Sequence, residues 1–248
     1  MSDLLEIKSL YAGYGSNIVL EDVSLTVGEN DFIGVIGPNG GGKTTLLRII
    51  LGLIKPASGT ILFKGENLKM YQIGYLPQIS EGDNTFPVTV KDVVLSGLMI
   101  KKRLTGRMSI PDKKEADRIM EELGLSGMGK VSLTELSGGQ LQRVFLGRAI
   151  IGSPVLLLLD EPGNFVDFTF EHDFYDKLKE LNKRMAILMV SHDVGTISSH
   201  VKSFACVNKS LHYHASAEIT NEQLNSYGCP IQLVAHGDIP HTILEKHI

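Results

Sequence analysis

Residues 37–44 have the sequence Gly-Pro-Asn-Gly-Gly-Gly-Lys-Thr, which fits the pattern G-x-x-x-x-G-K-[ST]. Glycines let successive backbone N–H groups turn toward phosphate oxygens, and a following helix directs its positive end at them. The apolar segment 31–37 predicts a buried strand before this loop, and the apolar segment 43–53 predicts a buried helix after it. We therefore expect a nucleotide-binding loop in which Lys43 reaches the terminal phosphates and the Thr44 hydroxyl ligates Mg²⁺.

Other apolar segments indicate the fold class. Residues 155–159 and 185–190 show no polar alternation, as in strands that are covered on both faces of a parallel sheet. The segment 170–182 predicts a helix between them, and the segment from about 88 to 151 is mostly helical by pattern. Strands that alternate with helices predict an α/β domain with a mostly parallel sheet.

Two carboxylates, Asp160 and Glu161, directly follow the apolar segment 155–159. A carboxylate at the carboxyl end of a central strand points into the crevice where α/β sheets bind ligands. We expect Asp160 to hold Mg²⁺ through its water shell and Glu161 to polarise an attacking water. Acids that follow a strand are often only solvated turn residues, and the loop at 37–44 is what favours the catalytic interpretation.

Composition excludes several classes of protein. The formal net charge is −4, from 24 Lys and Arg against 28 Asp and Glu, so we expect no nucleic-acid partner. The two cysteines, Cys206 and Cys229, form no disulfide framework or zinc-finger spacing, which fits a reducing cytosol. The first eight residues hold no apolar stretch typical of a secretory signal. The longest apolar runs are too short to span a bilayer, so action at a membrane would require a separate membrane subunit.

The segment 136–140, Leu-Ser-Gly-Gly-Gln, predicts the start of a helix. Ser137 and Gln140 have the spacing of a capping box, and Leu136 and Leu141 have the spacing of a hydrophobic staple. A helix that opens on Gly138 and Gly139 offers a second anion site. A plain, well-capped helix is the alternative, but it leaves two exposed, helix-weakening glycines unexplained.

These motifs, in this order, resemble those of the ABC transporter ATPases, whose signature is LSGGQ. The resemblance covers nearly the whole chain and implies one ABC ATPase domain over residues 1–248. It implies a P-loop NTPase core with a mostly parallel sheet, an N-terminal antiparallel β part and an inserted helical subdomain at roughly 85–150. The polar segment at roughly 209–248 is expected to be a peripheral C-terminal extension.

The resemblance also implies roles for individual residues. Tyr14 would stack on adenine, Gln78 would contact Mg²⁺ and the attacking water, and His192 would contact the γ-phosphate. Asp167 corresponds to the aspartate of a loop at the dimer interface. The implied cofactors are ATP and Mg²⁺. The residues expected to bind ATP within one copy are Gly37, Pro38, Asn39, Gly40, Gly41, Gly42, Lys43, Thr44 and Thr45. Those expected to coordinate Mg²⁺ are Thr44, Gln78 and Asp160. Ser137, Gly138, Gly139 and Gln140 would contact ATP held by a second copy.

The sequence departs from the family's pattern at two places. Gly41 stands where the family usually has Ala or Ser, and we expect this exchange to be harmless in a loop that favours small residues. The segment 163–167, Gly-Asn-Phe-Val-Asp, replaces the usual Thr-x-x-Leu-Asp pattern and keeps only Asp167. Contacts made by Asn164 and Phe165 across a dimer would therefore differ from those of the family.

Segments 86–97, 207–214 and 236–241 are similar to the branch that imports zinc or manganese. The implied function is an ATPase that powers metal-ion uptake. The implied partners are a second copy, an integral membrane permease and, indirectly, an extracytoplasmic metal-binding protein. The implied location is cytoplasmic, at the inner face of the cell membrane. An importer of another substrate and a soluble ABC ATPase of the iron–sulfur assembly type remain alternatives, whereas a silent binding module would lack Glu161 or Lys43.

Six of the eight histidines lie at or after His200. Imidazole suits Zn²⁺, and His212 and His214 would point to the same face of a strand. One hypothesis is a metal sensor that slows the ATPase. The alternative is a set of ordinary surface histidines, because no spacing here provides four ligands for a closed tetrahedral site.

Overall fold

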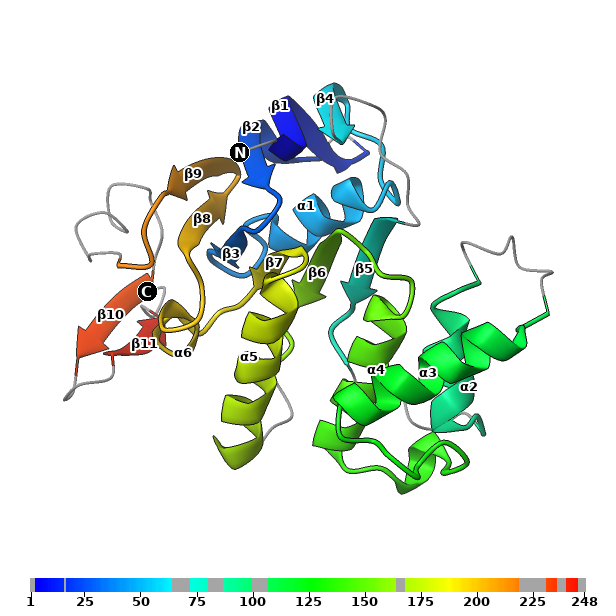
Figure 1. Cartoon of the computed structure of the whole chain (residues 1–248). Helices are drawn as coiled ribbons and strands as arrows, with labels where there is room; N and C mark the ends of the chain where they lie inside the picture. Colours follow the sequence, from blue (N-terminus) through cyan, green and yellow to red (C-terminus); the bar gives the residue numbers. More distant parts are fainter. Residues whose placement is uncertain are drawn as a thin grey trace. The chain divides into compact units, whose positions relative to one another are not determined.

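A computed structural model, drawn in Figure 1, describes most of the chain. The chain divides into two compact units. One unit comprises Met1–Lys69 and Ala186–Ile248, and the other comprises Met70–Met185. The described residues are 3–15, 17–63, 72–79, 87–99, 107–163, 168–218, 231–235 and 240–244.

The first unit begins with an antiparallel sheet of order β2-β1-β4, formed by β1 (Asp3–Tyr14), β2 (Asn17–Gly28) and β4 (Ser58–Phe63). Leu20, Val23, Leu25 and Val27 of β2 are buried, and exposed residues lie between Val23, Leu25 and Val27. This alternation is typical of a sheet that covers a core with one face. The predicted N-terminal antiparallel part is confirmed.

The same unit contains a second sheet with the order β7-β3-β8-β9. β3 (Phe32–Ile36) pairs in parallel with β7 (Ala186–Val190) and with β8 (Ser203–Asn208). All residues of β3 and β7 are buried, as the absence of polar alternation predicts. β9 (Ser210–His214) adds an antiparallel strand beside β8.

Two helices and a pair of strands complete the described part of the first unit. α1 (Lys43–Ile50) follows the loop after β3, and α6 (Val194–Ser198) follows β7 and lies against β3 and β11. β10 (Ile231–Ala235) and β11 (Pro240–Leu244) form an antiparallel hairpin (Figure 1).

The second unit combines a parallel strand pair with helices. β5 (Ile73–Leu76) pairs with β6 (Leu156–Asp160), and α5 (Phe168–Asn182) follows β6. α2 (Val90–Ser96) lies against α3 (Ile110–Glu122) and α4 (Gly138–Ile150), and the three helices lie together in Figure 1. A short 3₁₀ turn, η2, spans Leu133–Glu135. The described part of the segment predicted to be helical therefore consists mainly of helices.

Helix boundaries in this unit follow from side-chain caps. Thr89 and Asp92 form a capping box at the start of α2, and Ser109 and Asp112 form one at the start of α3. Each box satisfies amides that the first turn of a helix leaves without an intrahelical partner.

Two predicted boundaries differ from the structure. The helix expected over 43–53 ends at Ile50, because Gly52 adopts a φ of 68° and the amide of Leu53 donates to the carbonyl of Arg48 at 2.9 Å. The helix expected from residue 170 already begins at Phe168. Both differences concern the ends of an element and leave its type unchanged.

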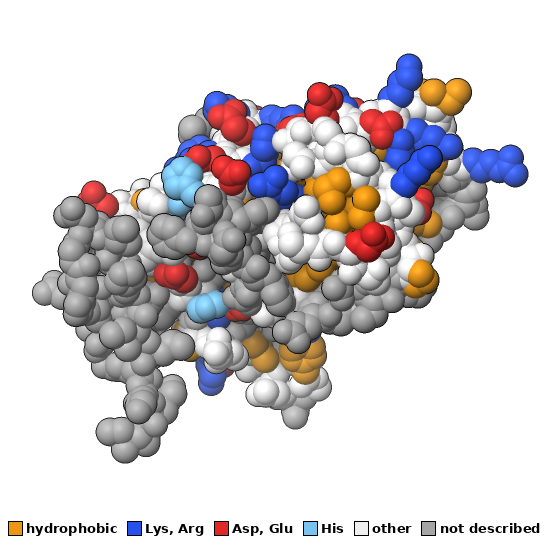
Figure 2. Space-filling view, turned by 90° about the horizontal axis from the view of Figure 1, so that it is seen from below, with side chains coloured by type: hydrophobic (Ala, Val, Ile, Leu, Met, Phe, Trp, Pro, Cys, Tyr) orange, Lys and Arg blue, Asp and Glu red, His pale blue; other side chains and the backbone are white. Residues whose placement is uncertain are grey.

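Within the described ranges, no helix has the length and apolar character that crossing a bilayer would require. Figure 2 shows acidic side chains among the basic ones over the face that it draws, with a group of Lys and Arg side chains at one end. Charged side chains of both signs are thus mixed on the described part of that face.

Candidate functional site

The loop at residues 37–42 has the backbone that its glycines predict. Gly37, Gly40 and Gly42 adopt φ values of 146°, 76° and 106°. Gly42 is the N-cap of α1, and no side chain hydrogen-bonds to the first amides of that helix there. A helix N-terminus without a side-chain cap presents its N–H groups to a bound anion. The local geometry is that of a phosphate-binding loop.

Lys43 folds back over this loop. Its Nζ donates to the carbonyl oxygens of Gly37 and Pro38, both at 2.9 Å, and the residue is 6% exposed. These contacts hold the ammonium group at the loop, where a phosphate would meet the amides. Thr44 and Thr45 follow on the first turn of α1, with Thr45 buried.

The carboxyl end of β8 packs against the phosphate-binding loop. A Cβ on Gly41 would lie 2.7 Å from the carbonyl oxygen of Val207 and 3.0 Å from that of Pro38. Lys209, whose φ is 60°, donates its amide to the carbonyl of Gly41 at 3.1 Å, and its carbonyl accepts from the amide of Glu21 at 2.8 Å. Backbone atoms thus occupy the space that a side chain at position 41 would need. The expectation that glycine is harmless at this position stays a prediction.

Gly41→Ala is expected to lower the free energy of unfolding by about 1–3 kcal/mol, because a methyl group must displace backbone on two sides. Gly152→Ala is the matched control, since a Cβ at Gly152 meets nothing within 4 Å, and we expect its effect to stay within about 0.5 kcal/mol. Chemical denaturation of both variants measures the difference. Equal midpoints for Gly41→Ala and Gly152→Ala would contradict the close contact.

Tyr14 lies at the end of β1 and is 48% exposed. Hydrogen bonds from the side chains of Thr45 and then Arg48 lower the pKa of the Tyr14 phenol below its usual value. The Nη1 of Arg48 lies 3.3 Å from the phenolic oxygen. The ring is thus fixed at its polar end to the helix after the phosphate loop. No sequence pattern indicated the contact of Arg48, although this residue lies one helical turn beyond Thr44.

His192 follows β7 and is exposed. Its neighbours form a local turn, in which the Asp193 amide donates to Ser191 Oγ at 3.0 Å. Asp193 then caps α6 by accepting from the amide of Thr196 at 3.1 Å. The turn fixes the backbone on which His192 stands.

The second unit contains the carboxylates at the end of β6. Asp160 is 5% exposed, and the Tyr75 hydroxyl lies 3.5 Å from its Oδ2. Glu161 is partly exposed, has a φ of 48°, and accepts a hydrogen bond at its Oε2 from Nε2 of Gln78 at 3.1 Å. The structure thus brings together Gln78 and Glu161, two residues that the sequence analysis assigned to the same reaction.

The predicted capping box at the start of α4 is confirmed. Ser137 Oγ accepts from the amide of Gln140 at 3.3 Å, and Gln140 Oε1 accepts from the amide of Ser137 at 3.0 Å. Leu136 and Leu141 are both buried, as a hydrophobic staple requires. Gly138 is exposed, but Gly139 is buried, so the expected exposure of both glycines is wrong for Gly139.

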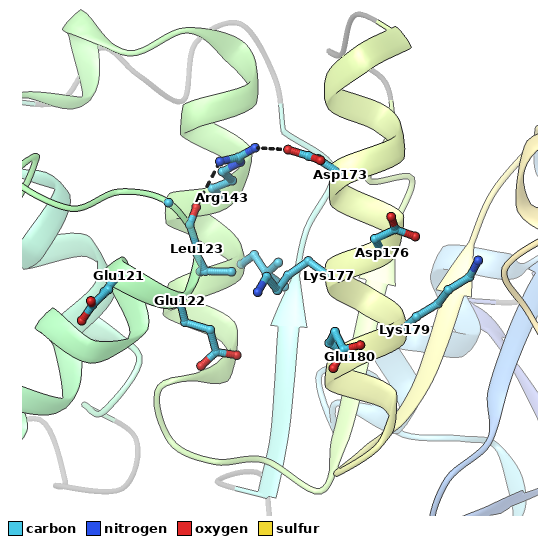
Figure 3. Close-up of a pocket in the computed structure, with 11 residues that line it drawn as sticks. Glu121, Glu122, Leu123, Arg143, Asp173, Asp176, Lys177, Lys179 and Glu180 are labelled. Atoms are coloured by element: carbon cyan, nitrogen blue, oxygen red, sulfur yellow. Dashed lines mark hydrogen bonds and ion pairs between the residues drawn. The ribbon is translucent and has the colours of Figure 1, made fainter.

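Sequence reasoning missed the two residues that follow the staple. The Nε2 of Gln142 donates to the carbonyl oxygen of Pro162, and Gln142 is 1% exposed. Arg143 Nη2 lies 3.4 Å from Asp173 Oδ2, and its Nη1 donates to the carbonyl of Leu123 at 3.3 Å (Figure 3). A glutamine placed among apolar helix positions is the one local signal that could have indicated the buried contact.

The histidine hypothesis gains no support from β9. His212 Nε2 lies 3.4 Å from Ser210 Oγ, and His214 Nε2 lies 2.9 Å from the carbonyl oxygen of Glu218. Among the described residues, no three His, Cys, Asp or Glu side chains are placed to share a metal ion. The part of the cluster at His236 and His247, the side chain of His241, and the predicted loop with Asn164, Phe165 and Asp167 lie outside what the structure describes.

Comparisons with known proteins identify the family. The family model described as ABC transporter matches residues 20–164. The zinc uptake system ATP-binding protein ZurA of Listeria monocytogenes is 37% identical over 224 residues, covering 88% of this chain and 87% of that protein. The zinc import ATP-binding protein ZnuC of Haemophilus influenzae is 35% identical over 208 residues, covering 83% of this chain and 72% of that protein.

A solved structure gives the same result for the fold. The ATP-binding cassette of an ABC transporter, in its ADP conformation, superposes with a TM-score of 0.76 at 25% identity and covers 86% of this chain and 90% of that one. The phosphate loop, the acidic end of β6 and the capped helix α4 thus occur in a chain whose sequence and fold both match one family. The chain belongs to the ABC transporter family, as one of its ATP-binding and ATP-hydrolysing members.

Proposed function

We propose that this chain powers the uptake of a metal ion, zinc or manganese, through a separate membrane permease. The observation that carries the proposal is the similarity, at 37% and 35% identity over most of the chain, to two proteins named for zinc uptake or import. The metal ion is the transported substrate and does not belong to the ATPase site. The alternative functions are import of another substrate and iron–sulfur assembly, and the experiment below distinguishes them from metal uptake.

The proposed ATP site divides the work among named residues. Backbone amides of residues 37–45 hold the phosphates, and Lys43 adds an ammonium group already positioned at that loop. Tyr14, fixed by Thr45 and Arg48 at its hydroxyl, stacks its exposed ring on adenine. These residues bind ATP and take no part in the hydrolysis step itself.

Mg²⁺ fits the donors that the chain offers. Thr44 supplies a hydroxyl oxygen, Gln78 an amide oxygen and Asp160 a carboxylate that is almost fully buried, and oxygen ligands are those that Mg²⁺ prefers. When bound, this ion neutralises charge on the phosphates. Glu161 orients and polarises the attacking water, and His192 contacts the γ-phosphate.

The remaining assignments require a second copy of the chain. Ser137, Gly138, Gly139 and Gln140 open a capped helix whose N-terminus suits an anion, and we propose that they bind the γ-phosphate held by the partner. Asp167 belongs to the loop at the same interface. The homodimer acts at the cytoplasmic face of the membrane with its permease, which receives the metal from an extracytoplasmic binding protein.

Uptake by living cells tests the transported substrate. Cells that carry Glu161→Gln in place of the wild-type chain are expected to lose at least about 90% of ATP-dependent uptake of radioactive zinc or manganese, because transport requires hydrolysis. The tagged wild-type chain should also co-purify with a membrane protein that has several spanning helices. Unchanged uptake of both metals, or isolation with soluble iron–sulfur assembly proteins alone, would overturn the proposed function.

A further inference from the structure

The backbone of Glu161 is held in an unfavourable conformation. Its φ of 48° lies in the left-handed region, where residues with a Cβ are strained. Pro162 follows, and a proline further restricts the backbone of the residue before it. Such a conformation persists only where surrounding contacts fix it. The direction in which Glu161 presents its carboxylate therefore depends on whatever holds residues 161 and 162.

One buried contact acts directly on this segment. The side-chain amide of Gln142, from α4, donates to the carbonyl oxygen of Pro162, and both residues are buried. Pro162 has no N–H, so its carbonyl is its only backbone hydrogen-bonding group. The contact thus fixes the peptide between Pro162 and Gly163, one residue beyond Glu161, from a helix 20 residues earlier in the chain.

The helix that carries Gln142 is itself anchored on both sides. Arg143 joins the carbonyl of Leu123, at the end of α3, to Asp173 of α5 (Figure 3). Gly124, with a φ of 70°, leaves room for this guanidinium, since a Cβ there would lie 2.7 Å from Arg143 Nη1. A fixed α4 gives the Gln142 amide a defined position.

We infer that Gln142 is a positioning residue for ATP hydrolysis, which holds Glu161 through the Pro162 carbonyl and links it to the helix that begins at Ser137. This inference rests on the proposed catalytic role of Glu161. Because the same helix opens on residues 138 and 139, a displacement of α4 would be transmitted to the backbone of the catalytic carboxylate. Gln142 itself contacts neither nucleotide nor water in this role.

Gln142→Leu is expected to lower kcat for ATP hydrolysis about 10- to 100-fold, as a misplacement near 1 Å does in an active site. The KM for ATP should change less than about twofold, because the phosphate loop and Tyr14 keep their contacts. Asn182→Leu is the matched control. Asn182 is also a buried amide that donates to a backbone carbonyl, that of Met185 at 3.1 Å, and its loss should leave kcat within about twofold.

The pH dependence of kcat in Gln142→Glu distinguishes a hydrogen-bonding role of Gln142 from a role in packing alone. A carboxyl group at position 142 can donate to the Pro162 carbonyl only when protonated, and burial raises the pKa of such a group. The kcat of Gln142→Glu relative to wild type should therefore be highest at low pH and fall as pH rises through that pKa. The corresponding ratio for Gln142→Leu should not vary with pH. This variant also tests the inference if Gln142→Leu does not fold.

Adding Gln142→Leu to Glu161→Gln separates the inference from the proposed function. Because Gln142 acts through Glu161, the double variant should hydrolyse ATP no more slowly than Glu161→Gln alone. A kcat within twofold of wild type for folded Gln142→Leu, a loss equal to that of Asn182→Leu, or multiplied losses in the double variant would each overturn the inference and leave Glu161 catalytic. Wild-type turnover in Glu161→Gln would instead overturn the proposed function, and the inference with it.

Discussion

Glu161→Gln is expected to lower the rate of ATP hydrolysis about 10²–10⁴-fold, the usual contribution of a general base. The amide keeps the size of the carboxylate, and its oxygen can still accept the hydrogen bond from Gln78 Nε2, which now lies 3.1 Å from Glu161 Oε2. ATP binding should persist, since Lys43 and the amides of the phosphate loop are unchanged. Phosphate release and calorimetric ATP binding measure the two quantities separately.

Glu121→Gln provides the control for the change in charge. Glu121 is exposed at the end of α3 in the same unit, and its exchange should alter turnover less than about twofold. If ATP joins two copies as proposed, Glu161→Gln should also accumulate as an ATP-bound dimer on gel filtration, because the nucleotide is no longer cleaved. Near-normal turnover would show that another group polarises the water.

Gly138→Asp is expected to abolish most hydrolysis, by about 10²-fold or more, because it places a carboxylate where the partner's γ-phosphate would bind. The fold should be retained. Gly138 is exposed at the first position of α4, and an acidic residue in the first turn of a helix is favourable. The affinity of the monomer for ATP should hardly change. Gly138→Asn, which has nearly the same size without the charge, should lose less activity.

Mixing two inactive variants tests whether the site is shared. A dimer of Lys43→Ala with Gly138→Asp contains one pairing in which both the loop and the signature helix are wild type, provided that each site uses the helix of the partner. Turnover of the mixture should then exceed that of either variant alone. If the signature helix served its own chain, no mixed dimer would contain an intact site, and mixing would restore nothing.

Local patterns predicted those features that depend on near neighbours in the chain. The burial of β3, β6 and β7 follows from runs without polar residues, and the start of α4 follows from Ser137 and its capping partner. The conformation of the phosphate loop follows from its glycines. Each of these sequence patterns lies within a few residues of the strand, helix start or loop that it predicts.

Features that depend on distant contacts could not be predicted in this way. The steric requirement at Gly41 is set by the carbonyl of Val207, and Gly139 is buried although the capping pattern suggests an exposed helix end. The role of Gln142 depends on its meeting Pro162 in three dimensions. A contact between residues that are far apart in the chain leaves no local sequence pattern from which it could be predicted.

Lys209 limits how far the chain can be shortened. Its amide and carbonyl connect the phosphate loop at Gly41 to Glu21 of β2, and it stands at the turn between β8 and β9. A protein truncated at Asn208 would therefore lose a support of its nucleotide loop together with β9. A truncation designed for crystallisation should end after Glu218, which keeps both the turn and the strand.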